Sequence, residues 1–156
     1  MDGIKYSVII PMYNEQEVIK ESYRRLDGVM RPLGEEYELI FVNDGSRDKT
    51  MEIMLEIAKN DKHVKIVDFA RNFGHQTAVT AGMKYSSGDA VVIIDADLQD
   101  PPELIPGMLE KWKEGYEVVY GKRLKREGET KFKLFTAKAF YKVINSLSGN
   151  MIPMDT

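Results

Sequence analysis

Three carboxylates and one side-chain amide lie within six consecutive positions of the sequence: Asp95, Asp97, Gln99 and Asp100. They directly follow an uninterrupted apolar run over residues 90–94 (AVVII), and two prolines then end the extended backbone. A β-branched run of this kind predicts a strand that is covered on both faces. The acidic side chains at its end are therefore held close together, where they repel one another unless a cation lies among them. Oxygen ligands without Cys or His nearby suit Mg²⁺ or Mn²⁺ and argue against zinc.

The same residues have a purely structural alternative. Asp100 followed by Pro101 is a good signal for the start of a helix, so the acidic loop could simply cap the helix that follows it. An Asp-x-Asp tripeptide also occurs by chance. The ends of the other strands bear on this choice, because a ligand site at the edge of a sheet draws groups from several strands.

Composition indicates an ordinary globular protein. The chain has 156 residues, with 43% hydrophobic and 30% charged, which is enough for one domain with a core. Its net charge of −3, with both signs interspersed, argues against nucleic acid as a partner. Cysteine is absent, so disulfides and thiolate metal ligands are excluded. The N-terminus lacks the layout of a secretory signal and no apolar stretch reaches the roughly 18 residues of a membrane span, so we expect the chain as given to be soluble.

The hydrophobic pattern alternates between the two kinds of secondary structure along the chain. Strands are expected over residues 6–10, 37–42, 64–69, 90–94 and 117–120. Helices are expected over residues 15–30, 48–59, 76–85, 102–113 and 130–147, with a kink or a short 3₁₀ start near Pro106. This alternation predicts an α/β fold, a Rossmann-like and mainly parallel sheet with helices on both faces. No closing element follows residue 150, so we expect a single domain over residues 1–156 that is truncated from a longer protein; a frayed natural terminus is the alternative.

Polar residues follow every expected strand, at the edge where parallel sheets bind ligands. One site there could hold an aromatic ring at Tyr13, ring nitrogens or sugar hydroxyls at Glu15 and Asp44, and a metal-held diphosphate at Asp97. The first strand is not followed by G-x-G-x-x-G, and G-x-x-x-x-G-K-[ST] is absent, which argues against a nicotinamide dehydrogenase and a P-loop NTPase. A metal would then take over the task of the glycine loop and neutralise the leaving diphosphate.

Four segments together resemble the signatures of family 2 glycosyltransferases. They are residues 11–15 (PMYNE), 42–50 (VNDGSRDKT), 95–103 (DADLQDPPE) and, more weakly, 71–74 (RNFG). The wording of the third segment is similar to the branch that glycosylates polyprenyl phosphates, the bactoprenol glucosyltransferases and relatives of dolichyl-phosphate mannose synthase. The resemblance covers the chain from about Tyr6 onward and identifies it as an N-terminal catalytic domain.

The resemblance implies a GT-A fold, a nucleotide-sugar donor similar to UDP-glucose, and a polyprenyl phosphate acceptor at the cytoplasmic side of a membrane. Carried over by position, the donor-binding residues would be Pro11, Tyr13, Glu15, Asp44, Arg71, Asp95 and Ala96. The metal ligands would be Asp97, Gln99 and Asp95, with Asp97 assisting the leaving group. Structural roles compete with these assignments: Pro11 could only terminate a strand, Asp44 could form a turn, and Gln99 could cap a helix.

The basic run after the fifth expected strand would bind the acceptor. Its members Arg123, Lys125 and Arg126 occupy the place where similar enzymes meet the acceptor phosphate near the bilayer, and the guanidinium fork suits phosphate. A solvated charged face is the ordinary alternative. His75 is expected to be a loop or core histidine, and His63 a surface residue.

The implied reaction is an inverting transfer in which the acceptor phosphate attacks the anomeric carbon in line. The catalytic base stays unassigned, because the acidic motif of the similar enzymes is not matched by Asp155. A nucleotide-sugar-binding module without turnover and a transferase of the same fold with a saccharide acceptor stay open, as does a homo-oligomer. A phosphoacceptor receiver domain would need an acidic pair after the first strand, where this chain has Pro11-Met12-Tyr13.

Overall fold

The computed structural model describes residues 3–121. The chain divides into two compact units, Met1–Val119 and Tyr120–Thr156, and the first contains every helix and strand of the described residues. Within those residues, none of the helices is long and apolar enough to cross a membrane. The extent of the domain, expected over residues 1–156, stays a prediction.

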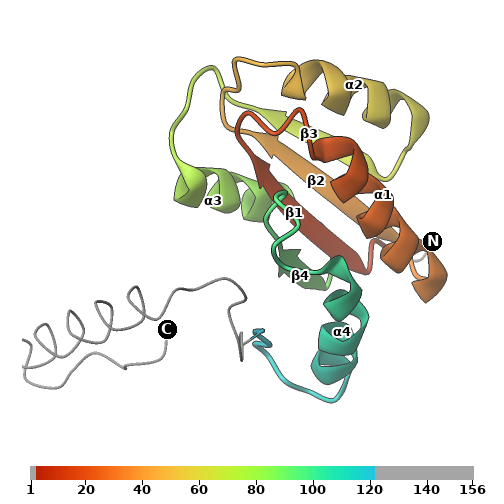
Figure 1. The fold of residues 1–156 in the computed structure, drawn as a ribbon. Coiled ribbons are helices and arrows are strands. Elements are labelled where there is room, and N and C mark those ends of the chain that lie inside the picture. The colour runs from red at the N-terminus through yellow and green to blue at the C-terminus, as the bar shows by residue number, and fades with distance from the viewer. Residues whose placement is uncertain (1–2, 122–156) are drawn as a thin grey trace, which may run out of the picture. The chain divides into compact units, whose positions relative to one another are not determined.

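Four parallel strands form the sheet, in the order β3-β2-β1-β4. Their bounds are β1 Tyr6–Met12, β2 Tyr37–Asn43, β3 Val64–Asp68 and β4 Ala90–Ile93. The helices that connect and follow them are α1 Ile19–Met30, α2 Thr50–Asn60, α3 His75–Tyr85 and α4 Ile105–Lys113, with short 3₁₀ turns at Arg31–Leu33 (η1) and Pro102–Leu104 (η2). Figure 1 shows α3 on the opposite side of the sheet from α1. The predicted parallel sheet with helices on both faces is confirmed.

The alternation of side chains along β1 builds two hydrophobic layers. Val8 and Ile10 face the larger core, which is completed by buried residues of α1, α2 and α4. Ile9 faces the smaller core under α3, where Gly82 lies so close that a Cβ atom on it would stand 2.3 Å from the Ile9 side chain. Every residue of β1 and β2 is buried, as expected for parallel strands that are covered on both faces. The prediction that the strand at residues 90–94 is covered on both faces is wrong, because β4 lies at the edge of the described sheet with Val91 44% and Ile93 49% exposed.

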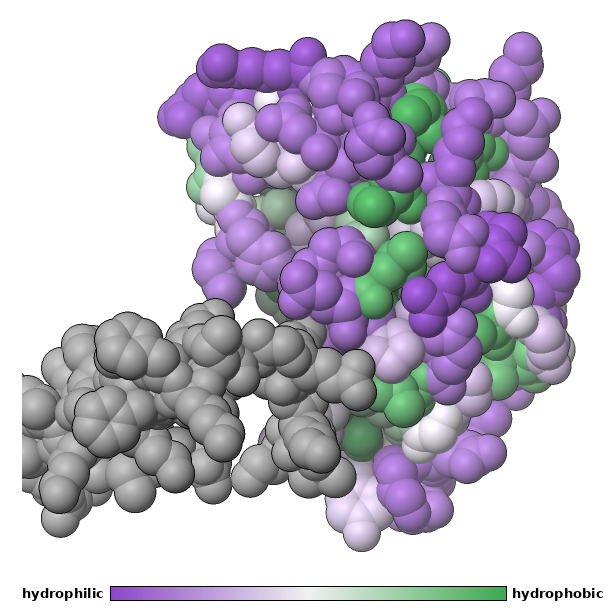
Figure 2. Space-filling model, viewed as in Figure 1, coloured by the Kyte–Doolittle hydropathy of each residue, from purple (hydrophilic) through white to green (hydrophobic). Residues whose placement is uncertain are grey.

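The outer surface is mainly polar, in contrast to these cores. Figure 2 shows a face that is mostly hydrophilic, with hydrophobic residues gathered in small areas. Small exposed hydrophobic areas are normal for a globular domain, because roughly half of the exposed surface of a folded protein is apolar.

Helix starts agree with the predictions except at α1. It begins at Ile19 rather than at Glu15, because the amide of Glu15 donates to Thr50 Oγ1 at 2.8 Å and the amide of Gln16 donates to Asp48 at 3.2 Å. These contacts hold the preceding residues in a loop. The short 3₁₀ start expected near Pro106 is confirmed as η2, directly before α4.

The prediction of a fifth strand over residues 117–120 is wrong. No strand forms there, and the side chain of Val118 is 79% exposed. A β-strand is stabilised by hydrogen bonds to a neighbouring strand, and in the described sheet no strand pairs with this segment. The prediction of a surface His63 is also wrong, because its side chain is only 15% exposed, stacked on Tyr37 at 4.4 Å and 2.6 Å from Asp61 Oδ1. The expected helix over residues 130–147 lies outside the described residues, as does the basic run of Arg123, Lys125 and Arg126.

Candidate functional site

A pocket of about 430 Å³ opens at the carboxyl ends of β1, β2 and β4, within the usual size range of small-molecule sites. The first two strands and their following loops contribute Pro11, Met12, Tyr13, Glu15 and Asp44. The β3–α3 loop and α3 contribute Asn72, Gly74, His75 and Ala78, and the residues after β4 are Asp95, Ala96 and Asp97. The pocket therefore lies where an open parallel sheet binds its ligands.

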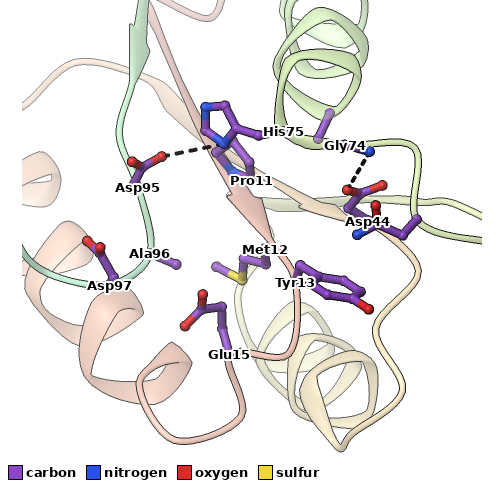
Figure 3. Close-up of a pocket in the computed structure, with 12 residues that line it drawn as sticks. Pro11, Met12, Tyr13, Glu15, Asp44, Gly74, His75, Asp95, Ala96 and Asp97 are labelled. Carbon is purple, nitrogen blue, oxygen red and sulfur yellow. Dashed lines mark hydrogen bonds and ion pairs between the residues drawn. The ribbon is translucent and has the colours of Figure 1, made fainter. Parts of the chain in front are cut away.

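Carboxylates gather on one side of this pocket. Figure 3 shows Asp95, Asp97 and Glu15 on one side of the pocket and Tyr13 and Asp44 on the other. Burial raises the pKa of Glu15, and the negative charges of Asp97, Asp48 and Asp95 raise it further. Mutual repulsion of this kind marks a place where a cation would relieve the electrostatic cost.

A tight turn presents Asp97 to the pocket. Its Oδ1 accepts a hydrogen bond from the backbone amide of Gln99 at 3.0 Å, and Leu98 between them has a φ of +61°. A left-handed leucine is energetically unfavourable and persists only where the surroundings impose it. Asp97 itself is exposed, so its second oxygen remains accessible to solvent and ligands.

These carboxylates fit a magnesium or manganese ion that is shared with a substrate. Among residues 3–121 no group of three or more His, Cys, Asp or Glu side chains is arranged to hold a metal ion by itself. Mg²⁺ commonly takes only one or two carboxylates, and substrate phosphates and water supply the remaining ligands. The open set of carboxylates in this pocket, Asp95 and Asp97 with Glu15, is compatible with that pattern.

Asp44 is buried and fixes the wall of the pocket. Its two carboxylate oxygens accept hydrogen bonds from the backbone amides of Phe73, at 2.7 Å, and Gly74, at 2.9 Å. The neighbouring Gly45 has a φ of +66°, and a Cβ atom there would stand 2.3 Å from the backbone carbon of Arg71. Only glycine permits both this conformation and this approach, so the β2–α2 and β3–α3 loops are locked together.

The loop between β1 and α1 is locked to the same neighbours. Asn14 has a φ of +57°, its amide donates to Ser46 Oγ at 3.0 Å, and its Oδ1 accepts from the amide of Arg47 at 2.8 Å. Together with the hydrogen bond from the Glu15 amide to Thr50 Oγ1, these contacts hold the backbone around Asn14. They thereby set the direction of the side chains on either side of it, the ring of Tyr13 and the carboxylate of Glu15. Residues of the segments 11–15 and 42–50 thus hold these two segments against each other.

Most of the residues that the sequence singled out lie together in the pocket: Pro11, Tyr13, Glu15, Asp44, Asp95, Ala96 and Asp97. Arg71 and Gln99 do not line it. The guanidinium of Arg71 stacks over the ring of Phe73 at 4.0 Å instead, and its Nη1 donates to the backbone oxygen of Asn72. The functions assigned to all these residues stay predictions.

Sequence reasoning missed two groups on the wall of the pocket. Asn72, rather than Arg71, faces the cavity, and His75 lies at the start of α3 with its Nδ1 3.8 Å from Asp95 Oδ1. Asn72 belongs to the segment 71–74, and His75 follows it directly. Their place in or directly after segment 71–74 could have pointed to them. A sequence motif does not show, however, which side chains of a turn point into a pocket.

Comparison with known proteins agrees with this geometry. The sequence matches the family model described as glycosyl transferase family 2 over residues 7–152. It is 59% identical over 153 residues to the uncharacterized glycosyltransferase YkcC of Bacillus subtilis (strain 168), an alignment that covers 98% of this chain and 47% of that protein. It is 41% identical over 145 residues to the bactoprenol glucosyl transferase of Shigella phage SfV, covering 93% of this chain and 47% of that one.

The name of a third relative includes undecaprenyl phosphate. The undecaprenyl-phosphate 4-deoxy-4-formamido-L-arabinose transferase of Klebsiella pneumoniae (strain 342) is 39% identical over 146 residues, which is 93% of this chain and 44% of that protein. The chain thus spans about half the length of the curated relatives it matches.

The fold is similar to that of solved glycosyltransferases. The mannosyltransferase PcManGT from Pyrobaculum calidifontis, in complex with GDP-Man and Mn²⁺, superposes with a TM-score of 0.65 at 23% identity, over 93% of this chain and 39% of that one. The receiver-domain alternative fails, because β1 leads into Tyr13 and Asn14 rather than into an acidic pair. The family match over most of the sequence, together with this fold, shows that the chain belongs to glycosyl transferase family 2 and has the GT-A fold.

Proposed function

We propose that the protein transfers a sugar from a nucleotide-sugar donor to a polyprenyl phosphate, with inversion at the anomeric carbon and with Mg²⁺ or Mn²⁺ bound. The observation that carries this proposal is the pocket that gathers Glu15, Asp95 and Asp97 on one side and has Tyr13 on the other. It offers an anionic side for a metal–diphosphate and an aromatic side for a base. The names of the bactoprenol and undecaprenyl-phosphate relatives support the lipid acceptor.

Different residues of the chain are proposed to bind different parts of the donor. Tyr13, which is 41% exposed, offers its ring to the base, and buried Asp44 fixes the wall beside it through the amides of the β3–α3 loop. Asp97 and Asp95 would hold the metal, which when bound supplies positive charge to the leaving diphosphate. Glu15 completes the anionic side. Positioning and charge stabilisation then supply most of the rate.

The acceptor requires little help from a base. A phosphate monoester has a second pKa of about 6 and is mostly dianionic at neutral pH, so its oxygen attacks without first losing a proton to a side chain. Arg123, Lys125 and Arg126 are proposed to bind this phosphate, since arginine matches phosphate with its planar fork. These three residues lie outside the described part of the chain.

Thermal unfolding in the presence of nucleotides tests the donor half of the proposal. UDP, GDP and their glucose and mannose conjugates are added with Mn²⁺, with Mg²⁺ or with EDTA. A nucleotide at ten times its Kd stabilises the folded state by about 1.4 kcal/mol, which is a measurable shift. Stabilisation by one nucleotide, larger with metal than with EDTA, is expected; no shift with any of them contradicts the proposed function.

Two aspartates at opposite ends of β4 provide the matched variants. Asp97→Asn is expected to remove the metal-dependent part of the shift, because a neutral amide is a much weaker ligand than a carboxylate for Mg²⁺ or Mn²⁺. Asp89→Asn, just before β4 and paired with Lys5 at 2.8 Å, is expected to keep it. Equal shifts in the two variants would contradict the metal role of Asp97.

Turnover separates the catalytic proposal from its alternatives. Full-length protein is assayed with the stabilising donor and either a polyprenyl phosphate or a soluble saccharide as acceptor. Transfer to the lipid phosphate supports the proposal, while transfer only to the saccharide shows a different acceptor class. Donor binding with no transfer identifies a nucleotide-sugar-binding module.

A further inference from the structure

An ion pair joins the acidic loop after β4 to the middle of helix α1. The guanidinium of Arg25 donates from Nε to Glu103 Oε1 at 3.0 Å and from Nη2 to Glu103 Oε2 at 2.5 Å. This is the bidentate geometry in which an arginine fixes both the position and the orientation of a carboxylate. The Arg25 side chain is 24% exposed and that of Glu103 is 53% exposed, so the pair lies at the protein surface.

Glu103 anchors the far end of the segment that presents Asp97. The segment leaves β4 at its carboxyl end, passes through the turn at Asp97, and enters η2 at the buried Pro102. Proline restricts its own φ and the conformation of the residue before it, so a fixed Glu103 limits the paths open to the loop. We therefore expect the contact of Glu103 with Arg25 to restrict the orientation of Asp97 through the short segment between Asp97 and Glu103.

Helix α1 also determines the place of the opposing carboxylate. The backbone oxygen of Glu15 accepts hydrogen bonds from the amides of Val18 and Ile19, which link Glu15 to the first turn of α1. Helix α1 is thus linked to the loop residue Glu15 through its first turn and to Glu103 through Arg25. Glu15 and Asp97 line the same pocket, and the negative charge of Asp97 is one cause of the raised pKa of Glu15.

We propose that Arg25 is a positioning residue for the metal–diphosphate site, which sets the separation of Asp97 and Glu15 by clamping Glu103 to α1. The inference rests on the proposed function, because it concerns the same site. Arg25 itself does not line the pocket. Its loss leaves the carboxylates in place but lets the loop after β4 sample more directions.

The neighbouring residue on the same helix makes an equivalent ion pair without touching the loop. Arg24 donates from Nε and Nη2 to the two oxygens of Glu21, at 2.7 and 2.6 Å, so both partners belong to α1. Arg24→Ala and Arg25→Ala remove the same side chain and the same kind of pair from adjacent helical positions. Because the Arg24 side chain is 70% exposed and that of Arg25 only 24%, the connection to the loop is reported by a difference in Mn²⁺-dependent binding and in loop exchange, and not by a difference in overall stability.

Two measurements on each variant test the proposal. The first is the Kd of UDP, or of GDP if wild type binds only that nucleotide, with saturating Mn²⁺ and with EDTA, by titration calorimetry. The second is amide hydrogen exchange of residues 96–100 in the metal-free protein. The Kd with Mn²⁺ should rise about two- to fivefold in Arg25→Ala, because an exposed ion pair makes only a modest contribution. The Kd with EDTA and both values for Arg24→Ala should stay at the wild-type level.

Exchange of the loop amides should be faster in Arg25→Ala than in Arg24→Ala, a change that a general loss of stability would not confine to this segment. The charge-reversed variants Arg25→Glu and Glu103→Arg should each weaken Mn²⁺-dependent binding, and their combination should restore it. Such rescue excludes damage to folding as the cause.

The outcomes for the two proposals are distinct. If wild type binds neither nucleotide, the proposed function fails. If wild type binds, but Arg25→Ala and Arg24→Ala have the same Kd with Mn²⁺ and the same loop exchange, the positioning role of Arg25 is overturned and the proposed function stands.

Discussion

A single methyl group added at Gly45 should unlock the wall of the pocket. The Cβ atom of Gly45→Ala would stand 2.3 Å from the backbone carbon of Arg71 and 2.6 Å from its Cα. Backbone atoms cannot rotate away as a flexible side chain can. To reach an ordinary contact of 3.4 Å, one of the two loops must therefore move by about 1.1 Å.

The energetic cost has two parts that a second glycine separates. Gly45 and Gly34 both have left-handed backbones, with φ of +66° and +70°, and a non-glycine residue pays about 1–2 kcal/mol for that conformation. Only Gly45 has a neighbour in the way, since nothing lies within 4 Å of a Cβ at Gly34. A loop displaced by about 1 Å also disturbs the two bonds to the Asp44 carboxylate, and hydrogen bonds to charged groups contribute about 1.5–3 kcal/mol.

Urea denaturation of the two variants measures these terms. Gly34→Ala should lower the free energy of unfolding by about 1–2 kcal/mol, and Gly45→Ala by about 3–5 kcal/mol. Gly45→Ala should also weaken nucleotide binding, because the displaced loop carries Asn72 and His75 on the pocket wall. Equal destabilisation by the two substitutions, or unchanged nucleotide affinity in Gly45→Ala, would refute this account of the interlocked loops.

Two further substitutions give pH-dependent outcomes. Burial and Asp97 raise the pKa of Glu15, so the charged form of Glu15 destabilises the folded state above that pKa. Glu15→Gln should therefore raise the Tm of the metal-free protein at pH 7 but not at pH 3, and it should weaken Mn²⁺-dependent nucleotide binding. An unchanged Tm at pH 7 contradicts this prediction. Burial opposes ionisation of Asp61, but hydrogen bonds from His63 and Tyr23 outweigh it and lower its pKa. Its stabilising effect is therefore complete above the unfolded pKa of about 3.9 and is lost as the pH falls through the folded value. Asp61→Asn should cost about 1–3 kcal/mol at pH 7 in urea denaturation, and a penalty that persists undiminished at pH 2 would exclude the charge as its source.

Much of the fold could be predicted because its signals are local. The apolar runs of β1 and β4 and the three-and-four spacing of α1 follow from which face each element buries. The segment 117–120 has the same kind of composition but forms no strand. Strand formation depends on a partner to pair with, and a window of sequence does not contain that partner.

The candidate site was predictable for a different reason. Parallel strands end at one edge of the sheet, so Tyr13, Asp44 and Asp97, far apart in sequence, could be placed together once the strands were recognised. That argument identifies the edge but not the direction of each side chain. Arg71 was expected in the site and stacks on Phe73, while Asn72 takes its place on the wall.

The sequence by itself determined the order of strands and helices, the family, and the carboxylates that converge at the edge of the sheet, because hydrophobic periodicity and contiguous motifs are properties of the chain. Only the tertiary structure decided how those groups are held. The two oxygens of Asp44 fix a loop about thirty residues away, and Arg25 grips Glu103 across a sequence separation of 78. Such contacts depend on how separate helices and loops pack in three dimensions, and no local pattern records that packing.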